Sequence, residues 1–449
     1  AHRDILMRSL GLEGQASLRA GIELRGAGDL TIAQDWNLWN AARTGEDPVA
    51  PFMLTVRAGG HLRVQGSLSD GFTSAAATGV IASGPAASMR LVAGADLGSA
   101  DLLAVGSAGT AGDLTVAGGK LVRTTAGSIE LAAARDVVLA PGSGATPTQG
   151  LVYVAGQPAT LSPEQLSLAP DIAALGFTDG GGRLAVHAGR DIQSAAPVQL
   201  PGNWLLHAAV ADGDGGVGAG AWASYLPAFK QGLGSFGGGG VQVSAGRDIV
   251  NLGVVAPTSG RHVQTWETDA DGMPVLQGVR LDVRNGGDVT VQAGRDILGG
   301  VFLLGRGEGR LEAGGAMARG SNLKADVPAQ GAILALMDGR WTLQARTGIE
   351  LAALYNPTAL SSPSTTRVPA ENAASFFTYG AQSGLHASTA SGDVVWDAQR
   401  TFSSFDAVVG TATRPTAVQG YFNYLHSSSQ LMPSADRLTR ALAVSNRLA

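Results

Sequence analysis

The sequence predicts an all-β fold, a right-handed parallel β-helix, from three observations. A short motif recurs along the chain, apolar residues alternate with other residues inside each copy, and glycine occupies 65 of the 449 positions. Alternation with a period of two is typical of a strand that buries one face. Strands that recur between glycine turns are typical of a solenoid, in which each coil buries its apolar side chains against the next coil.

The repeated motif is clearest in three copies that end in Ala-Gly-Arg-Asp-Ile, over residues 182–192, 240–249 and 287–297. Looser copies open at Gly28, Gly112, Gly127, Gly339 and Gly392. The alternation predicts that one set of apolar side chains lies inside the solenoid: Leu30, Ile32, Val186, Val243, Val289 and Val291.

The coil length is suggested by the N-terminal part of the chain. Gly14, Gly21 and Gly28 follow one another at intervals of seven residues, which fits a strand and a turn. Three such sides predict a coil of about 21 residues. With stacking at about 4.8 Å per rung, about 15 to 20 coils would form a rod on the order of 70 to 100 Å long.

Two other all-β architectures fit the repeats less well. A propeller needs blades of nearly constant length, whereas the motif arginines Arg190, Arg247 and Arg295 are separated first by 57 and then by 48 residues. An antiparallel sandwich needs hairpin dipeptides between strands, but here each strand is entered through glycine and left through Ala-Gly-Arg-Asp. Both patterns favour the open stack of a parallel β-helix.

The elements follow in chain order. The repeat region covers residues 1–400, with loop or short-helix inserts at about 203–240 and 356–385. In the first insert the side chains of Trp222, Tyr225, Leu226 and Phe229 have helical spacing, which predicts a short helix laid over the solenoid. The second insert contains a stretch rich in Ser, Thr and Pro, typical of a loop.

The repeat signal fades after Thr401, so residues 401–449 are expected to form a separate C-terminal segment. Ser434 is a suitable N-cap for a helix there, and Leu438, Leu442 and Leu448 lie near one helical face. We expect a helical cap over the open end of the solenoid.

Composition excludes several classes of partner. Only three of the 31 basic residues are lysine and no basic run interleaves with aromatic residues, which argues against a nucleic-acid partner. Long uncharged stretches contain Pro, Gly, Gln and Asn, so no membrane-spanning segment is expected. The chain has no initiator Met, no signal peptide and no cysteine. We expect it to be part of a longer protein. The lack of cysteine fits a cytosolic protein and equally a protein that crosses a membrane pore in the unfolded state, so composition alone does not choose between them.

Motifs that would hold a cofactor or a metal are incomplete. Residues 213–218 match G-x-G-x-x-G, but no βαβ unit surrounds them, so a flexible glycine loop is expected. Residues 267–272 resemble the start of a calcium loop, but its twelfth position is Gly278 rather than Glu, which favours a plain turn. Ser321 and Lys324 match S-x-x-K without its companion motifs, and the seven histidines form no zinc pattern. No cofactor and no metal site are predicted.

An enzyme that degrades polysaccharides is the main alternative, because parallel β-helices also carry such enzymes and the repeated Asp191, Asp248 and Asp296 would align on one side of the rod. Each aspartate follows Gly-Arg at a turn, where its side chain can cap backbone N–H groups. The neighbouring arginines would keep it ionised, which does not suit a general acid. We therefore expect no catalytic residue.

Exposed aromatic side chains on the inserts are the candidates for a binding surface, since recognition usually centres on aromatic anchors in loops. They could stack on a glycan, although side chains of this kind more often pack an insert onto its scaffold. The candidates are Trp222, Tyr225, Phe229, Phe376, Phe377, Tyr379, Tyr421 and Tyr424.

The ordered series of motifs resembles the filamentous haemagglutinin family, the large exoproteins of bacterial two-partner secretion. The likeness covers roughly residues 14–400 and includes a family region of uncharacterised role. The residues that carry it are the Ala-Gly-Arg-Asp-Ile copies and residues 28–38, 66–72, 234–239 and 251–261.

This resemblance implies a structural or adhesive shaft segment of a secreted protein at the bacterial cell surface, with a role in adhesion and virulence and no catalysis. An outer-membrane transporter would act through a secretion domain that this chain lacks. Surface glycans or proteins, or further copies of the chain, would be its other partners. The stalk of a contact-dependent inhibition protein, which delivers a toxin, is a further alternative within the same family.

Overall fold

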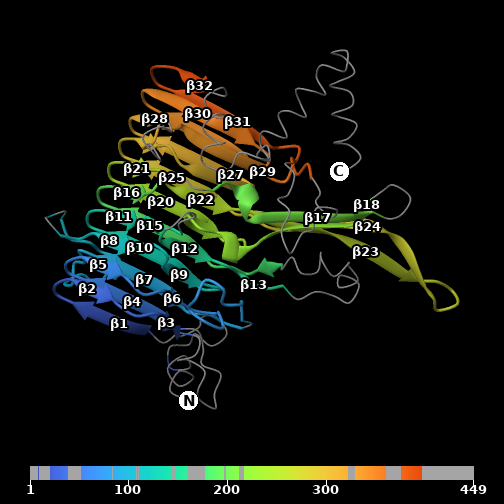
Figure 1. The fold of residues 1–449 in the computed structure, drawn as a ribbon, viewed down its shortest axis with the longest axis horizontal. Helices are drawn as coiled ribbons and strands as arrows, with labels where there is room; N and C mark the ends of the chain where they lie inside the picture. The colour runs from blue at the N-terminus through green and yellow to red at the C-terminus, as the bar shows by residue number, and fades with distance from the viewer. Residues whose placement is uncertain are drawn as a thin grey trace.

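The computed structural model describes residue 9 and residues 21–38, 52–82, 84–107, 109, 111–143, 148–159, 177–196, 199–211, 217–321, 329–359 and 376–396. Over these residues the chain forms a parallel β-helix, in which 26 strands belong to one continuous sheet wound around an apolar core (Figure 1). The predicted fold class is confirmed. No helix in this part of the chain is long and apolar enough to cross a membrane.

Strands of successive coils stack on three faces. Face 1 consists of β1 (Gly21–Gly26), β4 (Met53–Ala58), β7 (Ser88–Ala93), β10 (Ile129–Ala133), β15 (Leu184–Ala188), β20 (Val241–Ala245), β25 (Val289–Ala293), the C-terminal parts of β27 (Val301–Ala313) and β29 (Ala332–Ala345), and β31 (Gly384–Thr389).

Face 2 is built from shorter strands: β2 (Leu30–Ile32), β5 (Leu62–Val64), β8 (Leu114–Val116), β11 (Val137–Leu139), β16 (Ile192–Ser194), β21 (Ile249–Val250), β26 (Ile297–Leu298), β28 (Ala316–Ala318), the N-terminal part of β30 (Gly348–Tyr355), and β32 (Val394–Trp396). Face 3 consists of β3 (Trp36–Asn37), β6 (Leu68–Ser69), β9 (Leu121–Thr124), β12 (Leu151–Val154), β19 (Gly232–Ser235), β22 (Gly253–Ala256), the N-terminal parts of β27 and β29, and the C-terminal part of β30.

Ten coils stack on face 1 in the described part of the chain, and the register places equivalent residues above one another. The coil from Val291 to its partner Leu311 has 20 residues, which agrees with the predicted length, whereas the coil from Val186 to Val243 has 57. The prediction of about 15 to 20 coils is therefore too high for the described residues, because inserts lengthen most of the coils and fewer coils fit into the chain.

The core of the rod contains the residues that alternation predicts. Ile32, Val186, Val243, Val289 and Val291 are buried. Leu30, in one of the first described coils, is half-buried and packs against the same core. The strand of Val243 pairs in parallel with β15 in the coil before it and β25 in the coil after it, which excludes the antiparallel sandwich.

The glycine of the Ala-Gly-Arg-Asp motif is required by the close stacking of the coils. A Cβ atom on Gly246 would lie 2.2 Å from the carbonyl oxygen of Gly189 in the previous coil, and one on Gly294 would lie 2.2 Å from that of Gly246. Any side chain at these positions would therefore push apart two coils that must stay at the distance of hydrogen-bonded strands.

A four-stranded antiparallel sheet is attached beside the rod. It contains β17 (Leu205–Ala211), β18 (Val217–Ser224), β23 (Thr258–Thr268) and β24 (Pro274–Asn285). The predicted short helix is therefore wrong, since Trp222 lies in β18 and pairs with His207 of β17. Among the described residues of this insert, helical structure is limited to two 3-10 turns, η1 (Pro201–Asn203) and η2 (Leu226–Ala228). Pro227 has no N–H for an α-helix, and pairing with β17 satisfies the backbone of β18 instead.

The strands β23 and β24 form a hairpin that projects far from the rod (Figure 1). We call this hairpin the arm; it was not predicted from the sequence. A smaller insert pairs β13 (Gln157–Pro158) with β14 (Thr178–Asp179). Most of the predicted Ser/Thr/Pro loop, residues 360–375, and the predicted helical cap in 401–449 lie outside the described residues.

Candidate functional site

The repeated carboxylates are structural links between coils. Asp191 accepts a hydrogen bond of 2.8 Å from Nε of Arg247 and one of 3.1 Å from the backbone N–H of Asp248, both in the next coil. Asp248 makes the same contacts one coil further on, with Nε of Arg295 at 2.6 Å and the N–H of Asp296 at 3.2 Å. In each pair a second guanidinium nitrogen contacts the other carboxylate oxygen.

Asp136 binds Arg190 and the N–H of Asp191 in the same manner one coil earlier. Before it, Asp113 makes a longer version of the same link, with Nε of Arg135 at 3.4 Å and the N–H of Asp136 at 3.3 Å. We call the row of aspartates 136, 191 and 248 with arginines 190, 247 and 295 the corner ladder, because it follows the turn between faces 1 and 2. The expectation that each aspartate caps backbone N–H groups is confirmed. The closest arginine comes from the next coil, whereas the sequence neighbour Arg190 stays 4.0 Å from Asp191.

The ladder fixes the charges of Asp191 and Arg247. Burial alone would raise the pKa of Asp191, but the hydrogen bonds from Arg247 and the Asp248 N–H, together with the charges of Arg247 and Arg190, outweigh burial and lower the pKa below its usual value. The hydrogen bond to Asp191 raises the pKa of Arg247 in turn. A carboxylate held ionised in this way has no proton to donate, so it does not suit the role of general acid.

Asp296 ends the ladder. The next coil carries Gly315 and Ala316 in place of Arg and Asp, and the N–H of Ala316 donates to Asp296 at 2.7 Å. A Cβ atom on Gly315 would lie 2.3 Å from Oδ1 of Asp296, so a side chain at this position would require Asp296 to shift. The only ion pair of Asp296 in the described part of the chain is a long one, 3.6 Å to its neighbour Arg295.

Three of the aromatic candidates are buried, and the prediction that they are exposed is wrong for these three: Trp222, Phe229 and Phe376. The outer side of face 3 is apolar, and the inserts bury their aromatic rings against it. The rings of Trp222 and Phe376 are 5.3 Å apart, and Phe229 lies 6.1 Å from Tyr153 of β12. Their packing role is therefore the one that the structure supports.

The other aromatic candidates differ in position. Tyr225 is half-buried, and Phe377 and Tyr379 are 40% and 50% exposed. The structure does not bring these three onto one surface with the buried rings. Tyr421 and Tyr424 lie outside the described residues.

Two of the weak motifs lie on hairpins. Residues 217 and 218 begin β18 and 212–216 are outside the described residues, so the G-x-G-x-x-G match leads into a strand and not into a helix. The calcium-like segment forms the turn at the tip of the arm, as expected, and Oδ1 of Asp269 accepts hydrogen bonds from the N–H groups of Asp271 and Met273. The described residues contain no group of side chains that could hold a metal ion.

The outer side of face 1 carries a row of polar side chains that was not predicted from the sequence. We call it the polar strip. It runs over the last six described coils in two parallel columns. One column begins at the apolar Ala185 and continues with the polar residues Gln242, Thr290, Arg310, Thr342 and His386. The other column is polar throughout: His187, Ser244, Gln292, Glu312, Gln344 and Ser388.

The strip begins where a loop stops covering the face. In earlier coils the second column contains Val92 and Ala132, which are buried under Leu97, Leu103 and Val105. From His187 onward the same column is polar and open to solvent. The change from apolar to polar side chains at one structural position marks the boundary between a covered and a free surface.

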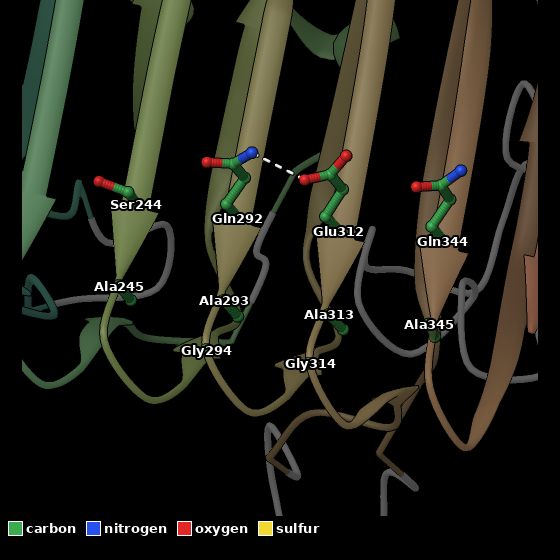
Figure 2. A pocket seen from close by; sticks show the side chains of 10 residues that line it. All are labelled: Ser244, Ala245, Gln292, Ala293, Gly294, Glu312, Ala313, Gly314, Gln344 and Ala345. Carbon is green, nitrogen blue, oxygen red and sulfur yellow. Dashed lines mark hydrogen bonds between the residues drawn. The ribbon is translucent and has the colours of Figure 1, made fainter. Parts of the chain in front are cut away.

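A shallow groove of about 510 Å³ lies along the strip (Figure 2). Its wall is formed by Ser244, Gln292, Glu312 and Gln344, which project from four successive strands, and its floor by the alanines and glycines that follow them. Nε2 of Gln292 donates to Glu312 at 2.7 Å, and Nη1 of Arg310 donates to the other oxygen of Glu312 at 3.0 Å. In the coil before the groove, Nδ1 of His187 lies 2.9 Å from Oγ of Ser244.

The sequence contained a signal for this strip. The residue just before the motif Ala is polar in four successive copies: His187, Ser244, Gln292 and Glu312. Alternation places that residue outward, so a comparison of the outward positions of the copies would have found the strip.

Comparison with known proteins adds no identification, since no family model, no curated protein and no solved structure matches the chain.

Proposed function

We propose that this chain is a shaft segment of a large secreted bacterial surface protein, and that it serves adhesion without catalysing a reaction. The observation that carries the proposal is the corner ladder. The repeated Asp191 and Asp248, the strongest catalytic candidates in the sequence, are committed to links between coils.

A scaffold role agrees with the distribution of the other distinctive residues. The motif glycines permit close stacking, and the aromatic residues of the inserts fill a second apolar cluster against face 3. Both sets of residues thus have a structural purpose that requires no substrate. The resemblance to filamentous haemagglutinins supports export and a place at the cell surface, with the transporter recognising a region outside this chain.

The enzyme alternative is tested by incubating the chain with bacterial and host polysaccharides and measuring new reducing ends and unsaturated sugars. We expect neither product. Depolymerisation that is reproducible and is lost in Asp191→Asn or Asp248→Asn, while circular dichroism shows an intact β-helix, would overturn the proposal.

Adhesion is tested by the binding of the purified, fluorescently labelled chain to bacterial and host cells. We expect saturable binding that excess unlabelled chain displaces. The same chain after heat denaturation is the control. Absence of saturable binding to every cell type would remove the adhesive part of the proposal and leave a spacer.

A further inference from the structure

We propose that the polar strip binds a neutral, hydroxyl-rich polysaccharide that lies along the axis of the rod. This inference rests on the proposed adhesive function and names its ligand class. Three properties of the strip carry it: its hydrogen-bonding groups, its charge balance and its shape.

The hydrogen-bonding groups of the strip both donate and accept. Three amides project from it, Gln242, Gln292 and Gln344, and they are joined by four hydroxyls and two imidazoles. Amides, hydroxyls and imidazoles match the hydroxyl groups of sugars, which also donate and accept. Gln242 and Gln344 make no side-chain hydrogen bond among the described residues, so their amides are available to a ligand.

The charges of the strip cancel. Arg310 and Glu312 are its only guanidinium and its only carboxylate, and they pair with each other at 3.0 Å. A polyanion such as a sulfated glycan or a nucleic acid needs a row of unpaired cations, which the strip does not offer. A neutral polymer meets no unbalanced charge on this surface.

The shape of the strip suits an extended chain. Equivalent side chains repeat at every coil, about 4.8 Å apart, so six coils present a straight row on the order of 24 Å long. The groove floor contains only small residues, among them Ala293, Gly294, Ala313 and Gly314, which lets a ligand approach the backbone closely. The loop over Val92 and Ala132 closes one end of the row.

A peptide ligand fits the strip less well than a polysaccharide. The interior strands of face 1 already pair with a strand on each side, so they offer no free edge for an added strand. The strip also lacks the aromatic and large apolar anchors on which peptide and protein recognition usually depends. A surface of amides and hydroxyls therefore favours the glycan.

The test is affinity gel electrophoresis of the full chain in gels that contain dextran, hydroxyethyl cellulose or galactomannan, with heparin and alginate as charged polysaccharides. We expect retardation by at least one neutral polysaccharide and not by the charged ones. Gln292→Ala and Gln344→Ala should each weaken binding about fivefold, which corresponds to the loss of one net hydrogen bond. The double variant should weaken it about 25-fold.

Gln193→Ala is the matched control, because it removes an amide from face 2 of the same rod and should leave binding unchanged. Circular dichroism of each variant verifies the fold. Retardation by no neutral polysaccharide, preferential binding to heparin, or neutral binding that the strip variants do not change would each overturn the proposal. Self-association of the chain that is abolished by Gln344→Ala would also overturn the proposal.

The adhesion assay separates the two proposals. If the chain binds cells and binding is unchanged in the double variant, adhesion stands and the strip proposal fails. If the chain binds a neutral polysaccharide through the strip but does not bind cells, the strip proposal stands and the adhesive function fails.

Discussion

The guanidinium of Arg123 lies 3.8 Å from the centre of the Phe72 ring and is completely buried. Its nitrogens donate hydrogen bonds to Oγ of Ser69 at 2.9 Å and to the hydroxyl of Tyr153 at 2.7 Å. They also reach the carbonyl oxygens of Ser74 and Ala76, at 2.9 and 2.6 Å. One buried cation therefore fastens the loop that follows β6 to the outer side of face 3.

Replacing this cation should destabilise the protein strongly. Arg123→Met leaves several buried acceptors without a donor, and we expect it to reduce the free energy of unfolding by about 3 kcal/mol. Arg123→Lys should recover little of the loss, because an ammonium group cannot reach all four acceptors. Urea denaturation measures both variants. Arg25→Met, at an exposed position of β1, is the control and should match the parent chain.

Acid should weaken the corner ladder. The pKa of Asp191 is lower in the folded chain than in the unfolded chain, where it is near 3.9, so its contribution to stability is complete above that value and is lost as the pH falls through the folded pKa. We expect the free energy of unfolding to decrease below about pH 4. Asp191→Asn should be less stable at pH 7 by roughly 2 kcal/mol and should show a shallower acid slope. An unchanged slope in Asp191→Asn would contradict the ladder's role.

Gly246→Ala should be poorly tolerated. Its Cβ atom would lie 2.2 Å from the carbonyl oxygen of Gly189, so two coils must separate locally, at a cost of about 3 kcal/mol. Gly384→Ala is the matched control, because a Cβ atom on Gly384 would meet no atom within 4 Å. Thermal denaturation compares the two variants. Equal melting temperatures would show that the coils yield at this corner.

The buried aromatic residues should contribute to stability, and the exposed ones should not. Trp222 is fully buried, and we expect Trp222→Ala to reduce the free energy of unfolding by about 4 kcal/mol. Phe377 is 40% exposed, and Phe377→Ala should change it by less than about 0.5 kcal/mol. Denaturant titration followed by circular dichroism gives both values. A large loss in Phe377→Ala would indicate that this side chain also anchors an insert.

Local patterns predicted the rod because a parallel β-helix repeats one local rule. Alternation at Val241 and Val243 determines which side chains face the core, and the glycine after the strand determines where the chain turns. The links between coils were harder to predict. Asp191 contacts Arg247 of the next coil, and the inserts between coils differ in length, so no fixed sequence spacing indicates which arginine is the partner. The sequence neighbour Arg190 was the simpler partner to expect.

Pairing over longer distances accounts for the remaining errors. The spacing of Trp222 and Phe229 fits a helix as well as it fits an apolar cluster, and only the strand partner of Trp222 in β17 decides between them. The arm had a local signal, since Asp271-Gly272 is a hairpin dipeptide between two strand-like segments. By itself this signal indicates only a turn, and the two long strands on either side of it were not predicted. The polar strip required comparison of the outward residues of successive copies, whereas the alternation analysis followed only the inward residues.

The end of the corner ladder at Asp296 gives the rod a mechanical polarity. Hydrogen bonds between coils run along the rod axis, so tension between the two ends loads the coils in series. Between Asp136 and Asp296 the corner between faces 1 and 2 adds a charged clasp at each of three consecutive junctions, whereas beyond Asp296 the described residues of this corner form no such clasp. In an optical-trap experiment, the coils after Asp296 should therefore peel away at lower force than those between Asp136 and Arg295.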